Sequence, residues 1–324
     1  QGKDLIRFRE GSFLNDHEVS LTDKAVRTYL PEDVDMLGDR EHVRRDVILS
    51  SSIRNVRLFY NDSEKQQMEY LQKLLTVKGY REVVARLKHQ GLREGFTILF
   101  HGGPGTGKTE SVYQLARRSG RDVMKVELSQ VRSMWFGESE KHVKNIFNIY
   151  RGLLRSSRRE PILLFNEADG IFGTRRELQH STTSHTSNTI QNILLEEMEG
   201  FEGILVATTN LTRNFDYAFE RRFLYKIRFS PPGAETRIQI WRTRVRGIPA
   251  AVAARLAREF EFSGGQIENV ARKVSIQTTL HGRDLSYGAL SALCREENLE
   301  YTAVRRVGFE IRSGTVNKEQ ERPS

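Results

Sequence analysis

The segment FTILFHGGPGTGKT at residues 96–109 decides the fold, because it joins an apolar run to a glycine-rich turn. The run FTILF at 96–100 has the length and composition of a buried strand. GGPGTGKT at 102–109 fits the pattern G-x-x-x-x-G-K-[ST], in which glycines let the backbone turn its N–H groups toward one point. Such a nest of N–H groups binds phosphate oxygens, so the segment predicts a phosphate-binding loop between a strand and a helix.

The residues of this loop have separate expected roles in binding a nucleoside triphosphate. The Lys108 ammonium would reach the β- and γ-phosphates, and the Thr109 hydroxyl would be a ligand of Mg²⁺. The segment that follows has Val112 and Leu115 on one helical face, and a helix N-terminus there adds partial positive charge beside the phosphates. The candidates for nucleotide binding are Gly102, Gly103, Pro104, Gly105, Thr106, Gly107, Lys108, Thr109 and Glu110.

Further apolar runs predict more strands of the same sheet, at residues 123–128, 162–165 and 204–208. They are nearly continuous and are separated by helical stretches, which indicates parallel strands covered on both faces. After Pro231 and Pro232 the strand signals stop, and four helical segments follow at 235–245, 250–259, 266–280 and 285–298. The expected fold class is therefore α/β, a three-layer parallel sheet followed by an α-helical subdomain.

The rest of the chain gives a coarser division. Helical spacing predicts helices between Asp62 and Lys88 and near Thr22–Leu30, whereas the polar patch HSTTSHTSNT at 180–189 predicts a mobile loop. We expect an N-terminal extension of unknown role at 1–55, a nucleotide-binding α/β subdomain at 56–230, a helical subdomain at 231–300 and a polar tail at 301–324.

Two further strand ends carry polar residues that suit hydrolysis of a bound nucleotide. PILLFNEAD at 161–169 contains Asn166 and Glu167, and Glu167 has the chemistry to activate a water molecule. The alternative for Glu167 is a solvated residue at a strand end. Asn166 stands where a carboxylate usually organises Mg²⁺, so its neutral amide predicts altered metal affinity or turnover. ILVATTN ends in Asn210, whose amide would position the attacking water or contact the γ-phosphate if its strand lies beside the strand at 96–100.

The adjacent arginines Arg221 and Arg222 follow in the segment FERRF. Guanidinium groups stabilise the charge that develops in phosphoryl transfer, and a neighbouring subunit often supplies them. An arginine pair is otherwise more often a solvated or ion-paired surface feature. The spacing after Asn210 is what favours a catalytic interpretation.

In this order the motifs resemble the AAA family of AAA+ ATPases, and within it the subgroup of protein unfoldases and segregases. GGPGTGKT is similar to the Walker A motif, and LLFNEAD to a Walker B motif with Asn166 in place of aspartate. Asn210 falls at the sensor 1 position, and Arg221 and Arg222 fall at the arginine fingers. Uncharacterised bacterial AAA ATPases share the FNEAD form, and the resemblance covers about residues 60–300.

The resemblance implies an ATP hydrolase that uses Mg²⁺ and assembles into a homo-oligomeric ring, most often a hexamer. Such a ring remodels, unfolds or translocates a protein substrate through its pore, and residues 231–300 would form the lid. Two departures are the neutral Asn166 and the adjacency of the two arginines. Gln266 lies near the place of a sensor 2 arginine, and the absence of that arginine agrees with the unfoldase subgroup.

A pore loop is the expected role of Met134, Trp135, Phe136 and Gly137. Three large apolar side chains before a glycine, in an otherwise polar stretch, suit either a core or a binding loop. The resemblance favours a loop that grips a protein substrate.

Composition restricts the kinds of partner and the cellular location that we expect for this protein. The 51 lysines and arginines exceed the 42 acidic residues by nine, but they are spread along the chain rather than gathered in a stripe, so nucleic acid is the less favoured partner. The two alternatives that remain open are a nucleic-acid-associated AAA+ motor or loader and a weakly hydrolysing nucleotide switch. No apolar run is long enough to span a membrane, and the single Cys294 excludes an internal disulfide, so we expect a cytoplasmic protein without a membrane partner.

Overall fold

A computed structural model describes residues 6–10, 17–21, 47–127, 139–173, 182–211, 215–282 and 284–298. Its centre is a six-stranded sheet in the order β3-β5-β6-β7-β4-β8. All neighbouring strands pair in parallel except β3, which is antiparallel to β5. The strands are β3 Val47–Ile48, β4 Phe96–Gly102, β5 Val123–Glu127, β6 Ile162–Asn166, β7 Ile204–Thr209 and β8 Tyr225–Phe229.

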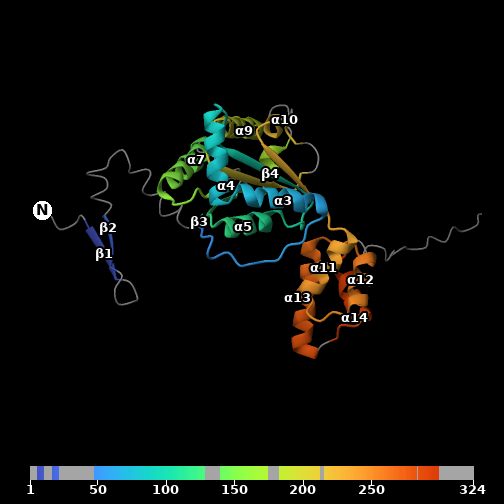
Figure 1. Ribbon diagram of the computed structural model, residues 1–324. Coiled ribbons are helices and arrows are strands. Elements are labelled where there is room, and N and C mark those ends of the chain that lie inside the picture. Colours follow the sequence, from blue (N-terminus) through green and yellow to red (C-terminus); the bar gives the residue numbers. More distant parts are fainter. Residues whose placement is uncertain are drawn as a thin grey trace, which may run out of the picture.

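Helices cover both faces of this sheet (Figure 1). On one face lie α3 Asp62–Leu74, α4 Val77–His89 and α5 Lys108–Ser119, and on the other lie α7 Ser139–Ser156 and α9 Thr182–Glu199. The two hydrophobic clusters alternate along β4, because Ile98 and Phe100 pack toward α3 and α5 while Leu99 packs toward α7 and α9. The predicted α/β class with a mostly parallel sheet in three layers is therefore confirmed.

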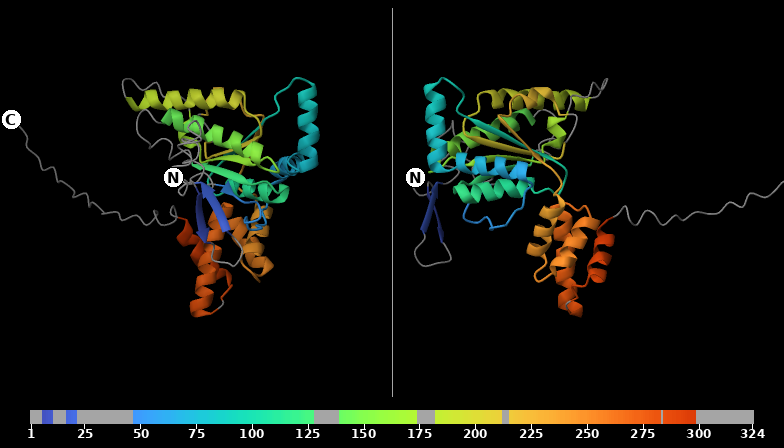
Figure 2. Two further views of the ribbon diagram at one scale, coloured as in Figure 1. Left: turned by 90° about the vertical axis from the view of Figure 1, so that its left-hand side faces the viewer. Right: turned by 45° about the vertical axis from the view of Figure 1, so that its right-hand side comes forward.

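Four helices after β8 pack around a third hydrophobic cluster. They are α11 Ala234–Arg244, α12 Ala250–Glu259, α13 Gly264–His281 and α14 Tyr287–Glu297. The cluster centres on Trp241 and Leu256, both fully buried, and it also contains Cys294. Burial raises the pKa of the Cys294 thiol to about 12, so this residue is a packing group rather than a nucleophile. Figure 2 shows this helical bundle below the sheet and its covering helices.

The strand β8 and the short strand β3 were not predicted. In β8, YKIRF, exposed charged residues alternate with the buried Ile227 and Phe229, as expected for an edge strand that has a neighbour on one side only. A two-stranded antiparallel hairpin, β1 Ile6–Glu10 with β2 His17–Leu21, was also missed. The helix predicted near Thr22–Leu30 and the tail at 301–324 lie outside the described residues.

The prediction of a mobile loop at 180–189 was wrong, because α9 already begins at Thr182. The helix continues into Ile190 and Leu194, which are buried against the sheet. Once packing holds those turns in place, each further helical residue adds a hydrogen bond at a small cost in free energy. Polar residues can therefore extend the helix toward its N-terminus. None of the helices that the structure describes, α9 included, is long and apolar enough to cross a membrane.

Candidate functional site

The polar residues expected to act together meet at one edge of the sheet. In the strand order, β7 lies between β4 and β6, so the carboxyl ends of these three strands are neighbours. Parallel strands direct their carboxyl ends to the same edge, where α/β folds bind ligands. The short helix α8 Asp169–Phe172 begins at this edge, and α5 begins there after the glycine-rich loop.

Two glycines of the loop leave no room for a side chain. At Gly102, with φ of 144°, a Cβ atom would lie 2.0 Å from the carbonyl oxygen of Phe229 in β8. At Gly105, with φ of 70°, it would lie 2.6 Å from the Ser263 hydroxyl, just before α13. The Gly105 carbonyl also accepts a hydrogen bond from Gly265 N at 3.0 Å, so the loop contacts the helical bundle directly.

Lys108 is the most constrained cation of the site, with 7% of its surface exposed. Its Nζ donates hydrogen bonds to the carbonyl oxygens of Gly102 at 2.9 Å and Gly103 at 2.8 Å, and to Asn210 Oδ1 at 2.9 Å. Burial lowers the pKa of Lys108, and the carboxylates of Asp169 and Glu167 oppose that shift. The ammonium is thus held where the loop and the end of β7 meet.

A hydroxyl–amide pair lies beside the lysine. Thr109 Oγ1 donates to Asn166 Oδ1 at 2.8 Å, and Thr208 Oγ1 donates to the same oxygen at 3.2 Å. The Asn166 Nδ2 faces both carboxylate oxygens of Glu127, each at 3.5 Å. Hydroxyl, amide and carboxylate oxygens are the ligand types that suit Mg²⁺, so this group of residues fits the ion that the loop motif implies.

Glu167 has an unusual backbone conformation. Its φ of 53° makes it the one non-glycine residue with a positive φ in the part of the chain that the structure describes. Its N–H donates to Thr208 Oγ1 at 3.1 Å, and it lines one cavity with Lys108, Thr109 and Asn210. Non-glycine residues in this region cluster at functional sites, where the surroundings hold them in place.

Asn210 is oriented by Asp169, which was not anticipated from the sequence. Asp169 Oδ1 accepts hydrogen bonds from Asn210 N and Thr209 Oγ1, both at 2.6 Å, and Oδ2 accepts from Asn210 Nδ2 at 3.0 Å. The amide oxygen of Asn210 is thereby left to face Lys108. The last residue of FNEAD was the available signal, but only the pairing of β6 with β7 shows its partner.

We expect Asp169→Asn to lower ATP turnover by about 10-fold or more while changing nucleotide affinity by less than about 3-fold, because Asn210 loses its orientation and not its contact with the loop. Steady-state phosphate release and a nucleotide titration separate the two effects. Asp284→Asn is the matched control, since Asp284 also accepts a backbone hydrogen bond but lies in the helical bundle. An equal loss of affinity and turnover in Asp169→Asn would contradict a positioning role.

The two arginines are not brought into this cavity within one chain. Arg222 forms an ion pair with Glu199 and donates to the carbonyl of Ala218 at 3.3 Å, so it ties the short helix α10 Tyr217–Glu220 to the end of α9. Arg221 is exposed and lies over the Tyr217 ring at 5.2 Å. Of the two, Arg221 is the one presented to the surface.

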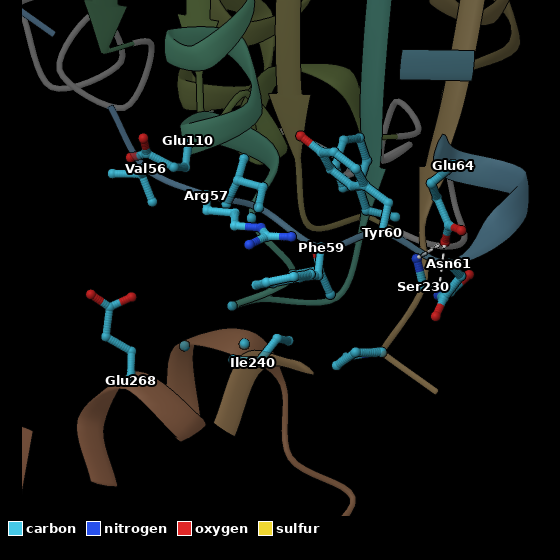
Figure 3. Close-up of a pocket in the computed structure, with 18 of the residues that line it drawn as sticks. Val56, Arg57, Phe59, Tyr60, Asn61, Glu64, Glu110, Ser230, Ile240 and Glu268 are labelled. Atoms are coloured by element: carbon cyan, nitrogen blue, oxygen red, sulfur yellow. Dashed lines mark hydrogen bonds between the residues drawn. The ribbon is translucent and has the colours of Figure 1, made fainter. Parts of the chain in front are cut away.

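A second cavity adjoins the loop on the side of the helical bundle (Figure 3). It is lined by the segment 56–61, by Gly105 and Gly107, and by residues of the bundle that include Ile240. Phe59 of this segment lies near Ile240 of the bundle, and the Arg57 guanidinium lies 5.1 Å from the Phe59 ring. A flat, mostly apolar group such as a nucleobase suits this lining. Sequence reasoning missed it because 56–61 carries no motif.

Two other expectations concern Gln266 and the pore loop. Gln266 is the N3 residue of α13, where it forms a capping box with Ser263, which gives it a structural partner. The expected pore loop of Met134, Trp135, Phe136 and Gly137 lies outside the described residues. Among the described residues there is no group of three or more His, Cys, Asp or Glu arranged to hold a metal ion.

Known proteins match part of this chain. Residues 98–231 match the family model described as "ATPase family associated with various cellular activities (AAA)". The cell division cycle protein 48 homolog of Archaeoglobus fulgidus is 31% identical over 189 residues, which are 55% of this chain and 25% of that protein. Human vacuolar protein sorting-associated protein 4A is 31% identical over 191 residues, 56% of this chain and 42% of that protein.

An uncharacterized AAA family ATPase of Sinorhizobium fredii is 28% identical over 234 residues, 71% of this chain and 63% of the relative. These matches confirm the resemblance to the AAA family of AAA+ ATPases, whose domain model covers residues 98–231 of this chain. The chain spans between a quarter and 63% of the length of these three relatives.

Proposed function

We propose that this chain binds ATP together with Mg²⁺ and hydrolyses it. The observation that carries the proposal is the convergence of the loop with the ends of β6 and β7, where Lys108 Nζ lies 2.9 Å from Asn210 Oδ1 and Thr109 Oγ1 lies 2.8 Å from Asn166 Oδ1. The adjoining aromatic cavity would take the adenine base, and the loop amides would take the phosphates. Residues 56–230 then act as the nucleotide-binding subdomain and 231–300 as its lid.

Each polar residue has a distinct task in this reaction. The Lys108 ammonium turns from the loop carbonyls to the β- and γ-phosphates, while Thr109 and Asn166 hold the metal. Mg²⁺ neutralises charge on the phosphate oxygens when it is bound. Glu167 takes a proton from the attacking water, and Asn210, held by Asp169, orients that water. The base Glu167 and the cation Lys108 line the same cavity, so both can act on one bound nucleotide.

The chain would act on proteins as part of a homo-oligomeric ring, and a hexamer is the form that we propose. The support is the exposed Arg221, which does not reach the cavity of its own chain, and the names of the relatives, which concern cell division and vacuolar protein sorting. In a ring, Arg221 of one subunit would contact the γ-phosphate bound by the next. The loop of Met134, Trp135, Phe136 and Gly137 would grip the substrate protein.

Mixing two inactive variants tests assembly of the site across subunits. Glu167→Gln removes the base within a subunit, and Arg221→Ala removes the group given to the neighbour. Because mixed rings contain sites with both groups intact, we expect the mixture to recover at least about a tenth of the wild-type rate. The matched control is a mixture of Glu167→Gln with Lys108→Ala, in which both defects lie in the same half of the site. Recovery in the control, or none in the test mixture, would contradict the arrangement.

The class of partner is tested by the effect of added polymers on the rate. An unfolded protein should stimulate phosphate release, whereas double- or single-stranded DNA should leave it unchanged. Stimulation by DNA alone would instead support a nucleic-acid motor or loader.

A further inference from the structure

Glu127 is the last residue of β5, and it lies directly opposite Asn166, the last residue of β6, in the parallel register. Both oxygens of its carboxylate are 3.5 Å from Asn166 Nδ2. Only the pairing of β5 with β6 brings the two together, since they are separated by 39 positions in the chain. A carboxylate therefore lies next to the one position of the site where a charge was expected and an amide is found.

The orientation of the Asn166 amide follows from its other partners. Its Oδ1 accepts hydrogen bonds from Thr109 and Thr208, so its Nδ2 is directed to the opposite side, toward Glu127. The amide oxygen of Asn166 thus accepts from Thr109, and the amide nitrogen faces the Glu127 carboxylate. Asn166 is 6% exposed, so this geometry is set inside the protein rather than at its surface.

An aspartate at position 166 would put two carboxylates against each other. Two carboxylates at this distance repel each other, and an amide at position 166 avoids that repulsion. With asparagine, the pair contains a single carboxylate, which belongs to Glu127. One carboxylate is therefore present at these two strand ends, and it is on β5 instead of β6.

We propose that Glu127 supplies the carboxylate that organises the water shell of Mg²⁺ in this site, in place of the aspartate that Asn166 replaces. The inference rests on the proposed function as an ATP- and Mg²⁺-binding protein. Mg²⁺ keeps several of its waters when it is bound to a protein. A carboxylate that is separated from Thr109 by Asn166 can therefore act on the ion through a water molecule, without being a direct ligand. Asn166 then links the threonine to Glu127.

The competing explanation is an ordinary ion pair. Lys125 Nζ lies 2.5 Å from Glu127 Oε1, and the two side chains are 31% and 28% exposed. The carboxylate raises the pKa of Lys125, chiefly through this hydrogen bond. Partly exposed pairs of this kind contribute little to stability, so removing either partner should have a small and similar effect if the pair were the whole role of Glu127.

The test measures how the affinity for a fluorescent ATP analogue depends on Mg²⁺, which needs no hydrolysis. We expect Glu127→Gln to raise the Mg²⁺ concentration at half-maximal binding by about 10-fold, with the affinity in EDTA unchanged within about 2-fold. Lys125→Met is the matched control and should leave the Mg²⁺ requirement unchanged or lower it. Asn166→Asp added to Glu127→Gln should restore most of the loss.

The outcomes separate this proposal from the function on which it rests. A protein that binds no ATP analogue in EDTA or in Mg²⁺ would overturn the proposed function itself. If ATP binds but Glu127→Gln and Lys125→Met give the same Mg²⁺ requirement as wild type, Glu127 has no role at the metal. Equal losses in both variants would assign Glu127 to the ion pair, and failure of Asn166→Asp to rescue would overturn the exchange of carboxylates.

Discussion

Lys108→Ala should abolish ATP binding, with a loss of affinity of at least about 100-fold, or about 2.7 kcal/mol. Its Nζ is already surrounded by the loop carbonyls and Asn210, so the ammonium is held within reach of phosphate and little freedom is lost on binding. Hydrogen bonds from a charged donor contribute roughly 1.5–3 kcal/mol each, and among the described residues Lys108 is the one lysine that lines this cavity. Fluorescence titration with an ATP analogue measures the loss.

The control for this variant must separate binding from folding. Lys226→Ala removes an exposed lysine of β8 that lies 3.9 Å from Glu220, and it should bind ATP as wild type does. Thermal unfolding should show that Lys108→Ala remains folded, because position 108 is the first residue of α5, where alanine is a good helix former. Wild-type affinity in a folded Lys108→Ala protein would contradict the assignment of the loop.

Glu167→Gln should lower hydrolysis by at least about 100-fold while ATP still binds within about 2-fold of wild type. The amide keeps the size of the side chain and its place in the cavity, but it cannot accept a proton from water. The backbone at Glu167 keeps its φ of 53°, and its N–H still donates to Thr208, so no structural change is expected. Rapid-quench measurement of ATP cleavage in a single turnover isolates the chemical step.

Glu82→Gln on α4 is the control for loss of a carboxylate, because Glu82 is exposed and its nearest charged partner, Lys78, is 3.9 Å away. It should cleave ATP at the wild-type rate. A Glu167→Gln protein that cleaves ATP as fast as this control would remove Glu167 from the mechanism.

The fold was predictable where sequence patterns are local. The strand FTILF, the glycine-rich turn and the helix that begins at Lys108 are adjacent in the chain, and their residues define them without help from elsewhere. The edge strand β8 was missed because its charged residues face solvent, so its apolar content is too low for a buried strand. The start of α9 was wrong because polar residues there depend on the packing of later turns.

The residues of the site were likewise predictable where they belong to local motifs and not where they depend on contacts between strands. Lys108, Thr109, Glu167 and Asn210 come from motifs, and the structure brings them to one cavity. Asp169 and Glu127 act through partners on neighbouring strands, and the order of strands in a sheet cannot be obtained from spacing along the chain. The aromatic cavity likewise joins Phe59 to Ile240, which lie in different parts of the fold. Contacts between distant segments are what the sequence alone leaves open.

Steady-state phosphate release from ATP by the wild-type protein, with Mg²⁺ present and the Glu167→Gln protein as the blank, tests the central claim most directly. A hydrolase with this site should release many phosphates per subunit, at a rate at least about 100-fold above the blank, and should stop when EDTA removes the metal. Release of no more than one phosphate per subunit, or a rate equal to that of the blank, would contradict hydrolysis at this site and leave a nucleotide switch.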